Sequence, residues 1–317
     1  MFDICCLGLL VVDITATPVD KLPNVGGVEL LDGIQQGLGG CAANTGIAMA
    51  KIGYNIAVIG KVGNDSFGKY TLDVLAENNI NIKGVAQCMD VPTSSAIVLL
   101  NSEAERSFLH VQGANGTINV DDIDFSIIQN SKILHIAGAN LMPRLDGEPT
   151  GKILKRAQQA GVYTSMDTAY DAFDRWMENI GPCLEHLDLF VPSYDEARML
   201  SGKTDVAEMA DFFLSHGVKL CVIKTGKDGC YIKNNSGSEL SVPTFDDIKV
   251  ADTTGAGDAF VAGFLTGILQ EWTLESCGRF ANAVGSMCVS QMGTSEGIRS
   301  LNDTLSFLRE RNIEIKI

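Results

Sequence analysis

Short apolar runs alternate with amphipathic segments along most of the chain, and this alternation restricts the fold more than any other feature. The runs are rich in Val, Ile and Leu and occupy residues 2–10, 55–62, 132–136, 162–166, 187–191 and 219–225. Between them, helical periodicity marks residues 42–52, 68–78, 150–160, 194–201 and 206–216. Strands that are apolar on both faces and separated by helices form parallel sheets, because a parallel connection needs a crossover. We therefore predict an α/β fold in which helices cover both faces of a mainly parallel central sheet.

Two segments interrupt this alternation. Residues 11–36 contain Pro18, Pro23 and paired glycines before an alternating stretch, and residues 92–111 have the pattern of two short strands around a turn. An alternating pattern is typical of an antiparallel sheet with one solvated face. The sequence therefore predicts a small β lid from residues 11–36 and 92–111, and an α/β core from residues 1–10, 37–91 and 112–317.

The composition argues against several classes of partner. The chain carries 24 basic and 39 acidic residues, for a net charge of −15, and its basic residues do not cluster. Neither nucleic acid nor a membrane is therefore expected as a partner, and no apolar run reaches the roughly 20 residues that span a bilayer. The nine cysteines form no C-x-x-C pair, which favours free thiols and a cytoplasmic location over zinc or disulfides.

Residues 252–260, DTTGAGDAF, indicate a specific chemistry. Small and hydroxylated residues at positions 254–257 stand directly before Asp258, which opens an apolar helical run. Glycines let backbone N–H groups approach a ligand, and the first turn of a helix offers free donors and partial positive charge to an anion. Asp258 can take the proton of an incoming hydroxyl while those donors hold a phosphoryl group. This segment predicts phosphoryl transfer to an alcohol.

A second glycine-rich segment, GLGGCAANTG, covers residues 37–46. Gly39 and Gly40 permit close approach of the backbone, and Asn44 offers both a donor and an acceptor. Gly37, Gly39 and Ala42 also fit the dinucleotide pattern G-x-G-x-x-A. However, the segment follows an alternating ribbon rather than a buried strand, and no acidic residue ends a second strand about 20 residues further on. A dinucleotide-binding dehydrogenase is therefore disfavoured.

Taken together, these segments resemble the two signatures of the ribokinase-like (PfkB-type) carbohydrate kinases. The first signature is matched by GLGGCAANTGIAMAKIG with KVGNDSFG, and the second by DTTGAGDAFVAGFL. The similarity extends to Pro92 with Thr93, to RSFLHVQGAN at 106–115, to VPSYDEARML at 191–200 and to IKTGKDGCY at 223–231. The resemblance implies a ribokinase-like three-layer sandwich. It also implies an enzyme that uses ATP and Mg²⁺ to phosphorylate a primary hydroxyl of a small sugar or polyol.

The resemblance further implies a role for individual residues. The catalytic base is Asp258, and the anion hole for the γ-phosphoryl is formed by Gly255, Ala256 and Gly257. The sugar is held by Asp13, Gly39, Gly40 and Asn44. Arg106, on the expected lid, is a further candidate for substrate contact, and a surface charge without that role is an equal alternative. The nucleotide is bound by Ser193, Glu196, Thr225, Gly226, Gly229, Thr254 and Asn282. Glu196 also supports Mg²⁺ through water, while Asp252 and Gly293 fall where some members hold a monovalent cation such as K⁺.

Three positions depart from the family pattern. Ser193 replaces the asparagine of the family's Asn-x-x-Glu motif, so its reach towards the magnesium water network is shorter. Cys41 stands where ribokinase has a lysine, which disfavours a ribose-specific assignment. A small thiol packed against the sheet is expected there, ahead of the alternative that the thiol contacts the substrate. Residues 167–171 lack the arginine that members acting on acidic sugars often carry, which disfavours an acidic ketosugar.

The alternatives to a sugar kinase are a nucleoside kinase and a sugar-sensing protein without catalytic activity. A nucleoside kinase of the same family would need an apolar slot for a base under the lid. A non-catalytic, sugar-sensing homologue would not need the base Asp258 together with its glycines. In this family, lids of this kind close over the sugar and often pair between subunits, so the resemblance implies a homodimer through the β lid.

Overall fold

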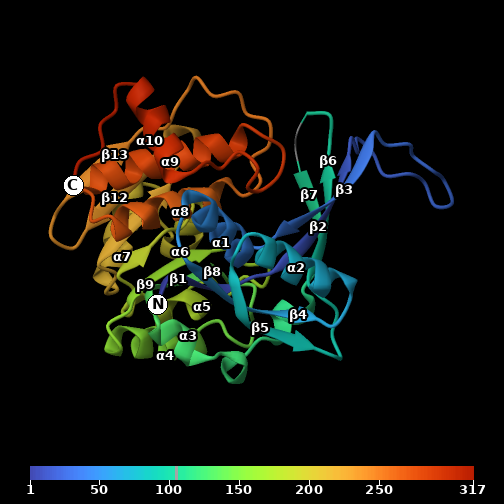
Figure 1. Cartoon of the computed structure of the whole chain (residues 1–317), viewed down its shortest axis with the longest axis horizontal. Helices are drawn as coiled ribbons and strands as arrows, with labels where there is room; N and C mark the ends of the chain where they lie inside the picture. Colours follow the sequence, from blue (N-terminus) through green and yellow to red (C-terminus); the bar gives the residue numbers. More distant parts are fainter. Residues whose placement is uncertain (104–105) are drawn as a thin grey trace.

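The structure is a computed structural model that describes residues 1–103 and 106–317, with the side chain of Arg106 outside the description. Within these residues the largest element is a nine-stranded sheet in the order β13-β12-β11-β10-β9-β8-β1-β4-β5 (Figure 1). Its strands are β1 Phe2–Gly8, β4 Ile56–Gly63, β5 Asn81–Cys88, β8 Ser131–Ala139, β9 Tyr163–Thr168, β10 Leu189–Phe190, β11 Leu220–Lys224, β12 Cys230–Asn234 and β13 Glu239–Val242. Neighbours from β5 to β11 are parallel, whereas β12 and β13 add antiparallel pairs. The predicted mainly parallel sheet is confirmed.

Each face of this sheet has its own apolar core. Along β1, Ile4 and Cys6 belong to one buried cluster, while Cys5 and Leu7 belong to the other, because successive side chains of a strand point to opposite faces. Helices α1, α2, α8, α9 and α10 supply side chains to the first cluster, and α3 to α7 supply the second. The helices are α1 Cys41–Ile52, α2 Ser66–Glu77, α3 Phe125–Gln129, α4 Glu148–Gln159, α5 Trp176–Leu184, α6 Tyr194–Ser201, α7 Val206–Ser215, α8 Ala256–Leu269, α9 Leu274–Val289 and α10 Leu301–Glu310. The three-layer arrangement follows from this two-sided burial.

A second sheet projects from the core (Figure 1). In the described part of the chain it has four strands in the order β3-β2-β6-β7, formed by β2 Val11–Thr17, β3 Gly33–Gly39, β6 Ser95–Leu100 and β7 Arg106–Val111. The β2–β3 and β6–β7 pairs are antiparallel, and a parallel β2–β6 pairing joins the two ribbons. The division of the chain into core and lid at residues 11–36 and 92–111 stays a prediction, and β3 continues past residue 36.

The junction between the two sheets depends on close backbone contact. β3 ends at Gly39 and α1 begins at Cys41, so Gly40 alone connects the second sheet to a core helix. Gly40 has a φ of +90°, and a Cβ at this position would lie 2.5 Å from the carbonyl oxygen of Leu9. A glycine is therefore required here on both conformational and steric grounds. Among the described residues, no helix is both long and apolar enough to cross a bilayer.

Candidate active site

The two glycine-rich segments meet at one hydrogen bond. Asn44 lies in the first turn of α1 and Asp258 in the first turn of α8. The amide nitrogen Nδ2 of Asn44 donates to Oδ2 of Asp258 at 2.8 Å, across 214 positions of sequence. The fold thus places the expected acceptor-binding residue Asn44 against the expected base.

The first turn of α8 exposes backbone donors beside Asp258. Gly255 caps the helix with a φ of +76°, and a Cβ there would lie 2.5 Å from the carbonyl oxygen of Thr294. The N–H groups of Gly257 and Asp258 donate to no acceptor within the described residues. These donors sit at the positive end of a 14-residue helix. An anion can bind there, and the anion hole at Gly255, Ala256 and Gly257 stays a prediction.

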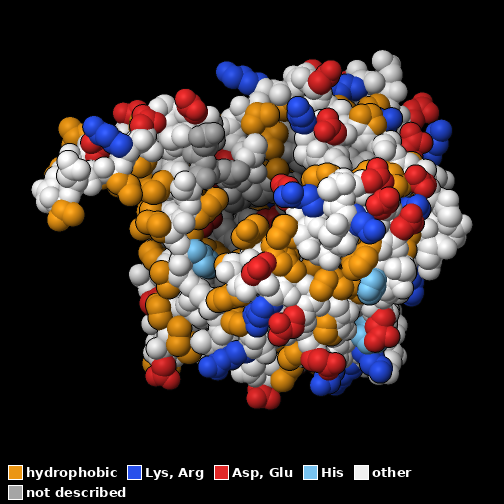
Figure 2. Space-filling model, turned by 180° about the vertical axis from the view of Figure 1, so that it is seen from behind, with side chains coloured by type: hydrophobic (Ala, Val, Ile, Leu, Met, Phe, Trp, Pro, Cys, Tyr) orange, Lys and Arg blue, Asp and Glu red, His pale blue; other side chains and the backbone are white. Residues whose placement is uncertain are grey.

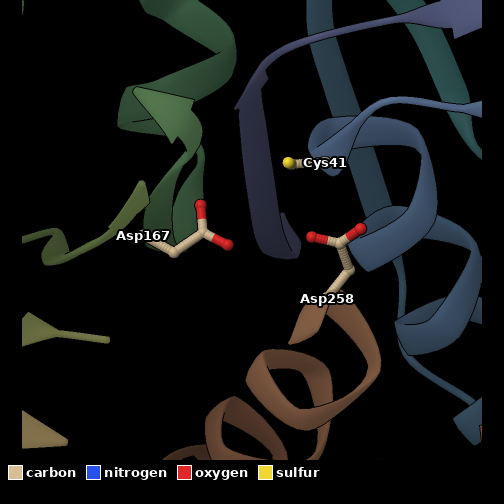
Figure 3. A group of neighbouring side chains, drawn as sticks. All are labelled: Cys41, Asp167 and Asp258. Atoms are coloured by element: carbon tan, nitrogen blue, oxygen red, sulfur yellow. The ribbon is translucent and has the colours of Figure 1, made fainter. Parts of the chain in front are cut away.

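Two further side chains surround Asp258. A carboxylate oxygen of Asp167, the Sγ of Cys41 and a carboxylate oxygen of Asp258 all lie within 4.8 Å of one another. In Figure 3 the two carboxyl groups face each other from β9 and α8, with the thiol beside them. The N–H of Gly138 donates to Oδ1 of Asp167 at 2.7 Å, which fixes this carboxyl group. Cys41 therefore packs against the buried clusters of the sheet, as expected, and its thiol also lies at the site.

Asp167 was not among the residues expected at the site, although one signal for it is present in the sequence. Asp167 follows directly on the apolar run 162–166, at the carboxyl end of a predicted parallel strand. Ligands of open α/β sheets bind outside the carboxyl ends of their strands. A carboxylate at that position is thus a candidate for the site even without a family motif.

Burial dominates the electrostatics of the two carboxyl groups. Burial raises the pKa of Asp167 to about 7, with the Lys224 ammonium opposing the shift and the Asp258 charge adding to it. Burial likewise raises the pKa of Asp258 above its ordinary value, and the hydrogen bond from Asn44 and the charge of Lys224 oppose it. Two carboxylates that share a buried site each disfavour ionisation of the other. The pair therefore holds a proton more readily than two exposed carboxyl groups would.

His135 lies behind this pair and is fully buried. Its Nδ1 is 3.1 Å from the hydroxyl of Ser165, and its Nε2 is 3.8 Å from Oδ1 of Asp167. Burial, with a smaller effect of Lys224, lowers the pKa of His135 to about 3. The ring is therefore neutral and does not compensate the charge of Asp167.

The other expected sugar-binding residues lie where the second sheet meets the core. The carboxylate of Asp13, on β2, contacts the Cα side of Gly39, which leaves no space for a Cβ at that position. Burial raises the pKa of Asp13 to about 6. A cavity of about 230 Å³ lies beside Asp13, between the second sheet and the loops that carry Thr254 and Gly293. Arg106 begins β7, but its side chain lies outside the described residues.

Ser193 and Glu196 form a reciprocal cap at the start of α6. The backbone N–H of Ser193 donates to Oε2 of Glu196 at 2.7 Å, and the Ser193 hydroxyl accepts from the Glu196 N–H at 3.4 Å. The hydroxyl of Thr168 donates to the same Glu196 oxygen at 2.9 Å. The serine thus satisfies the helix end in place of the family asparagine.

The remaining nucleotide-binding candidates lie around β11, β12 and β13. Thr225, Gly226 and Gly229 form the turn between β11 and β12, and the Thr225 N–H donates to the Gly229 carbonyl at 2.9 Å. Asn282 is 4% exposed, and its amide donates to the carbonyls of Val242 and Pro243 at 2.9 and 3.1 Å. In this structure Asn282 therefore holds the end of β13 and the proline that follows it.

Asp252 ties together the two loops at the start of α8. Its Oδ1 accepts from the N–H and the hydroxyl of Thr254 at 2.8 and 2.6 Å, and its Oδ2 accepts from the Gly293 N–H at 3.1 Å. The carbonyl oxygens of Thr254 and Thr294 lie 3.6 and 3.3 Å from Sγ of Cys288. Oxygen atoms from both loops therefore converge near the residues expected to hold a monovalent cation.

Comparison with known proteins shows which family this chain resembles over most of its length. A family model described as pfkB family carbohydrate kinase matches residues 1–301. "Probable fructokinase-6, chloroplastic" from Arabidopsis thaliana is 32% identical over 295 residues, covering 87% of this chain and 76% of that protein. "Probable fructokinase-5" from the same plant is 28% identical over 322 residues, covering 96% and 98%.

Solved structures of other proteins have the same fold as this chain. The Arabidopsis thaliana ribokinase complexed with ribose and ATP has a TM-score of 0.84 and 25% identity, covering 97% of this chain and 99% of that one. A fructokinase with bound ATP from Xylella fastidiosa has a TM-score of 0.84 and 24% identity, covering 98% and 99%. The predicted ribokinase-like three-layer fold with a second small sheet is confirmed.

Proposed function

The chain belongs to the pfkB family carbohydrate kinases, and from this premise we propose that its acceptor is a small neutral sugar, with fructose as the first candidate. It is an ATP-dependent sugar kinase, a phosphotransferase with an alcohol group as acceptor, as its sequence predicts. The observation that supports the assignment of residues is the Asn44–Asp258 hydrogen bond, because it joins the expected acceptor site to the expected base.

In the proposed reaction, Asp258 takes the proton of the acceptor's primary hydroxyl. The hydroxyl oxygen forms a bond to the γ-phosphorus, the bond from that phosphorus to the β–γ bridging oxygen breaks, and ADP leaves with the electron pair. Free N–H groups at Gly257 and Asp258 stabilise the charge on the transferring phosphoryl group. The raised pKa of Asp258 makes it a stronger base than an exposed carboxylate.

The charges near the acceptor favour a neutral substrate. Asp13, Asp167 and Asp258 all contribute carboxyl groups to this region, and each would repel a sugar acid. Asp13, Gly39, Gly40 and Asn44 are the residues proposed to bind the sugar hydroxyls. The fructokinase names of the curated relatives make fructose the first sugar to test.

The nucleotide and its cations are proposed to bind residues other than those proposed for the sugar. The turn at Thr225, Gly226 and Gly229 is proposed to bind ATP. Oε2 of Glu196 already accepts two hydrogen bonds, whereas none engages Oε1 in the described residues, so this oxygen fits a water molecule of hydrated Mg²⁺. Bound Mg²⁺ would neutralise charge on the β- and γ-phosphates. Asp252 and Gly293 are proposed to hold K⁺ with nearby carbonyl oxygens.

The second sheet is proposed to act as a lid and to pair with a second copy of the chain. Its register places Ile14, Ile97 and Leu109 side by side on one face, whereas Asp13 lies on the face that lines the cavity. Ile97 is 44% exposed and Leu109 is 58% exposed. Figure 2 shows hydrophobic side chains along this projecting part of the molecule. Pairing between two lids would remove these side chains from water.

A panel of acceptors tests the assignment. ATP turnover is measured with fructose, ribose, a sugar acid and nucleosides, for the wild type and for Asp258→Asn. We expect fructose to give the highest kcat/KM and the variant to lose about 10² to 10⁴ in kcat. A preference for a nucleoside or a sugar acid would overturn the proposed acceptor. Full activity of the Asp258→Asn variant would overturn the role of the base.

A further inference from the structure

Lys224 approaches the anion-binding turn from a separate part of the fold. It is the last residue of β11, and its backbone pairs with the segment that carries Ser193. Its side chain extends over the first turn of α8, where Nζ lies 3.5 Å from the position that a Cβ on Gly257 would occupy. The absence of a side chain at Gly257 therefore leaves space next to this ammonium group.

The ammonium group of Lys224 has no partner among the residues that the structure describes. Within the described residues, it forms no hydrogen bond and no ion pair at contact distance. Its charge nevertheless influences Asp167 and Asp258, which places it close to the reacting groups. The side chain is only partly exposed, and three unused donors on a partly buried ammonium are costly unless an acceptor binds them.

Two positive groups converge at this point. The N-terminus of α8 carries partial positive charge and free N–H groups at Gly257 and Asp258. The Lys224 ammonium adds a full positive charge beside the same turn. Groups of the same sign repel each other, and an anion bound between them offsets this repulsion. In a kinase whose base is Asp258, the anion nearest to that base is the phosphoryl group in transit.

We propose that Lys224 is a catalytic residue that binds an oxygen of the γ-phosphoryl group during its transfer from ATP. This inference rests on the proposed function of Asp258 and adds a residue that the sequence analysis did not assign. The ammonium group donates a hydrogen bond to this oxygen and exchanges no proton with the substrate. The Lys224 ammonium neutralises charge on the transferring phosphoryl group. It does not contact the β-phosphate, so bound ADP has no such interaction with Lys224.

A purely structural role makes a different prediction. Lys224 could act on the two carboxyl groups alone, by opposing the rise in their pKa. Its removal would then move the pH profile of kcat/KM to higher pH, and activity would return in alkaline buffer. Affinity for the nucleotide would not depend on the presence of a γ-phosphate.

Nucleotide binding distinguishes the two roles. Calorimetry with Mg²⁺ measures the binding of ADP and of the β,γ-methylene analogue of ATP to the wild type, Lys224→Met and Lys224→Gln. Lys219→Met is the matched control, because Lys219 directly precedes β11 and pairs with Asp188 on the surface. Binding of ADP also reports whether each variant is folded.

We expect both Lys224 variants to bind the ATP analogue about 10- to 100-fold more weakly, while their affinity for ADP stays within about twofold. We expect kcat to fall by about 10²-fold at every pH tested, and Lys219→Met to behave as the wild type. An unchanged preference for the ATP analogue over ADP in both variants would overturn the inference, as would recovery of kcat at high pH. A wild type that neither binds the analogue nor phosphorylates a sugar would instead overturn the proposed function.

Discussion

At the scale of single residues, the two glycines of the GAG triplet are required for different reasons. Gly255 has a φ of +76°, and a Cβ there would lie 2.5 Å from the Thr294 carbonyl oxygen. Gly257 has no such backbone restriction, and the nearest atoms to an added Cβ belong to Lys224, at 3.5 and 3.9 Å. The first glycine therefore serves the fold, whereas the second keeps space open for a ligand.

We therefore predict opposite phenotypes for two alanine substitutions. Gly255→Ala should lower the free energy of unfolding by about 1–3 kcal/mol, because it strains the backbone and meets a carbonyl group. Gly257→Ala should leave the free energy of unfolding within about 0.5 kcal/mol but reduce kcat, because its methyl group occupies the space beside the Lys224 ammonium. Urea denaturation and steady-state kinetics check both. Equal destabilisation by the two substitutions would contradict this division of roles.

Asp167 gives a second prediction at this scale, which concerns pH. Its pKa is raised from an ordinary 3.8 to about 7 by burial. Between these values the folded protein retains a proton that the unfolded chain has released, so the contribution of Asp167 to stability falls as the pH rises. An asparagine at this position removes that cost and can still accept from the Gly138 N–H.

Asp167→Asn should therefore raise the free energy of unfolding at about pH 8 by about 1–3 kcal/mol, since one pKa unit corresponds to about 1.4 kcal/mol. The gain should shrink as the pH is lowered towards 5, where the wild-type carboxyl group is already protonated in the folded state. Thermal melting at several pH values measures the difference. A gain that is constant with pH, or a loss at pH 8, would contradict the assigned protonation.

At the scale of elements, the start of α6 shows how a departure from the family motif is accommodated. Ser193 and Glu196 cap the helix reciprocally, and the cap also positions the oxygen proposed to face Mg²⁺. Ser193→Ala should lower the free energy of unfolding by about 1 kcal/mol, because the Glu196 N–H loses its acceptor. Ser193→Asn is the matched control and should stay within about 0.5 kcal/mol of the wild type, because asparagine is an equally good cap. Denaturation curves of the three proteins decide between these outcomes.

The same scale shows which elements a sequence can predict. Buried parallel strands such as β1 and β8 are apolar on both faces, so their residues alone identified them. The edge strand β5 contains Asn81, Lys83 and Gln87 and is only partly buried, so it has no comparable apolar signal. Helix α5 contains Pro182, which interrupts helical periodicity. The strength of a strand's apolar pattern thus follows its burial, whereas a proline weakens the pattern of a helix even where the helix is buried.

Site residues in local sequence motifs can be predicted, whereas those that only the fold brings together cannot. The signature segments predicted Asp258 and Asn44, because glycine-rich turns at helix starts are local features of sequence. Asp167 on β9 and Lys224 on β11 come to this point from two other elements, and their proximity is a result of topology, whereas Cys41 shares α1 with Asn44. A lysine at the end of an apolar run, directly before an expected nucleotide-binding turn, was the available signal for Lys224.

At the scale of the whole molecule, the second sheet, which we propose to be a lid, leaves apolar side chains exposed. Ile34, Ile97, Leu109 and Val111 lie on the same face, with exposed fractions between 44% and 68%. The opposite face lines the cavity beside Asp13. A four-stranded sheet that projects from its core can bury this outer face only against another molecule, and a second lid offers a matching surface by symmetry.

Charged substitutions on the exposed apolar face of the second sheet should therefore separate the two copies of the proposed dimer. We predict that the wild type is a dimer by light scattering and that Ile97→Lys combined with Leu109→Lys makes it monomeric, because two buried ammonium groups oppose pairing of the lids. Met199→Lys is the matched control, since Met199 is 42% exposed on α6, away from the lid. The monomer should bind ADP normally but show a higher KM for the sugar, because the lid contacts the acceptor site and not the nucleotide turn. A monomeric wild type, or a double variant that remains dimeric, would show that the lid face does not hold two subunits together.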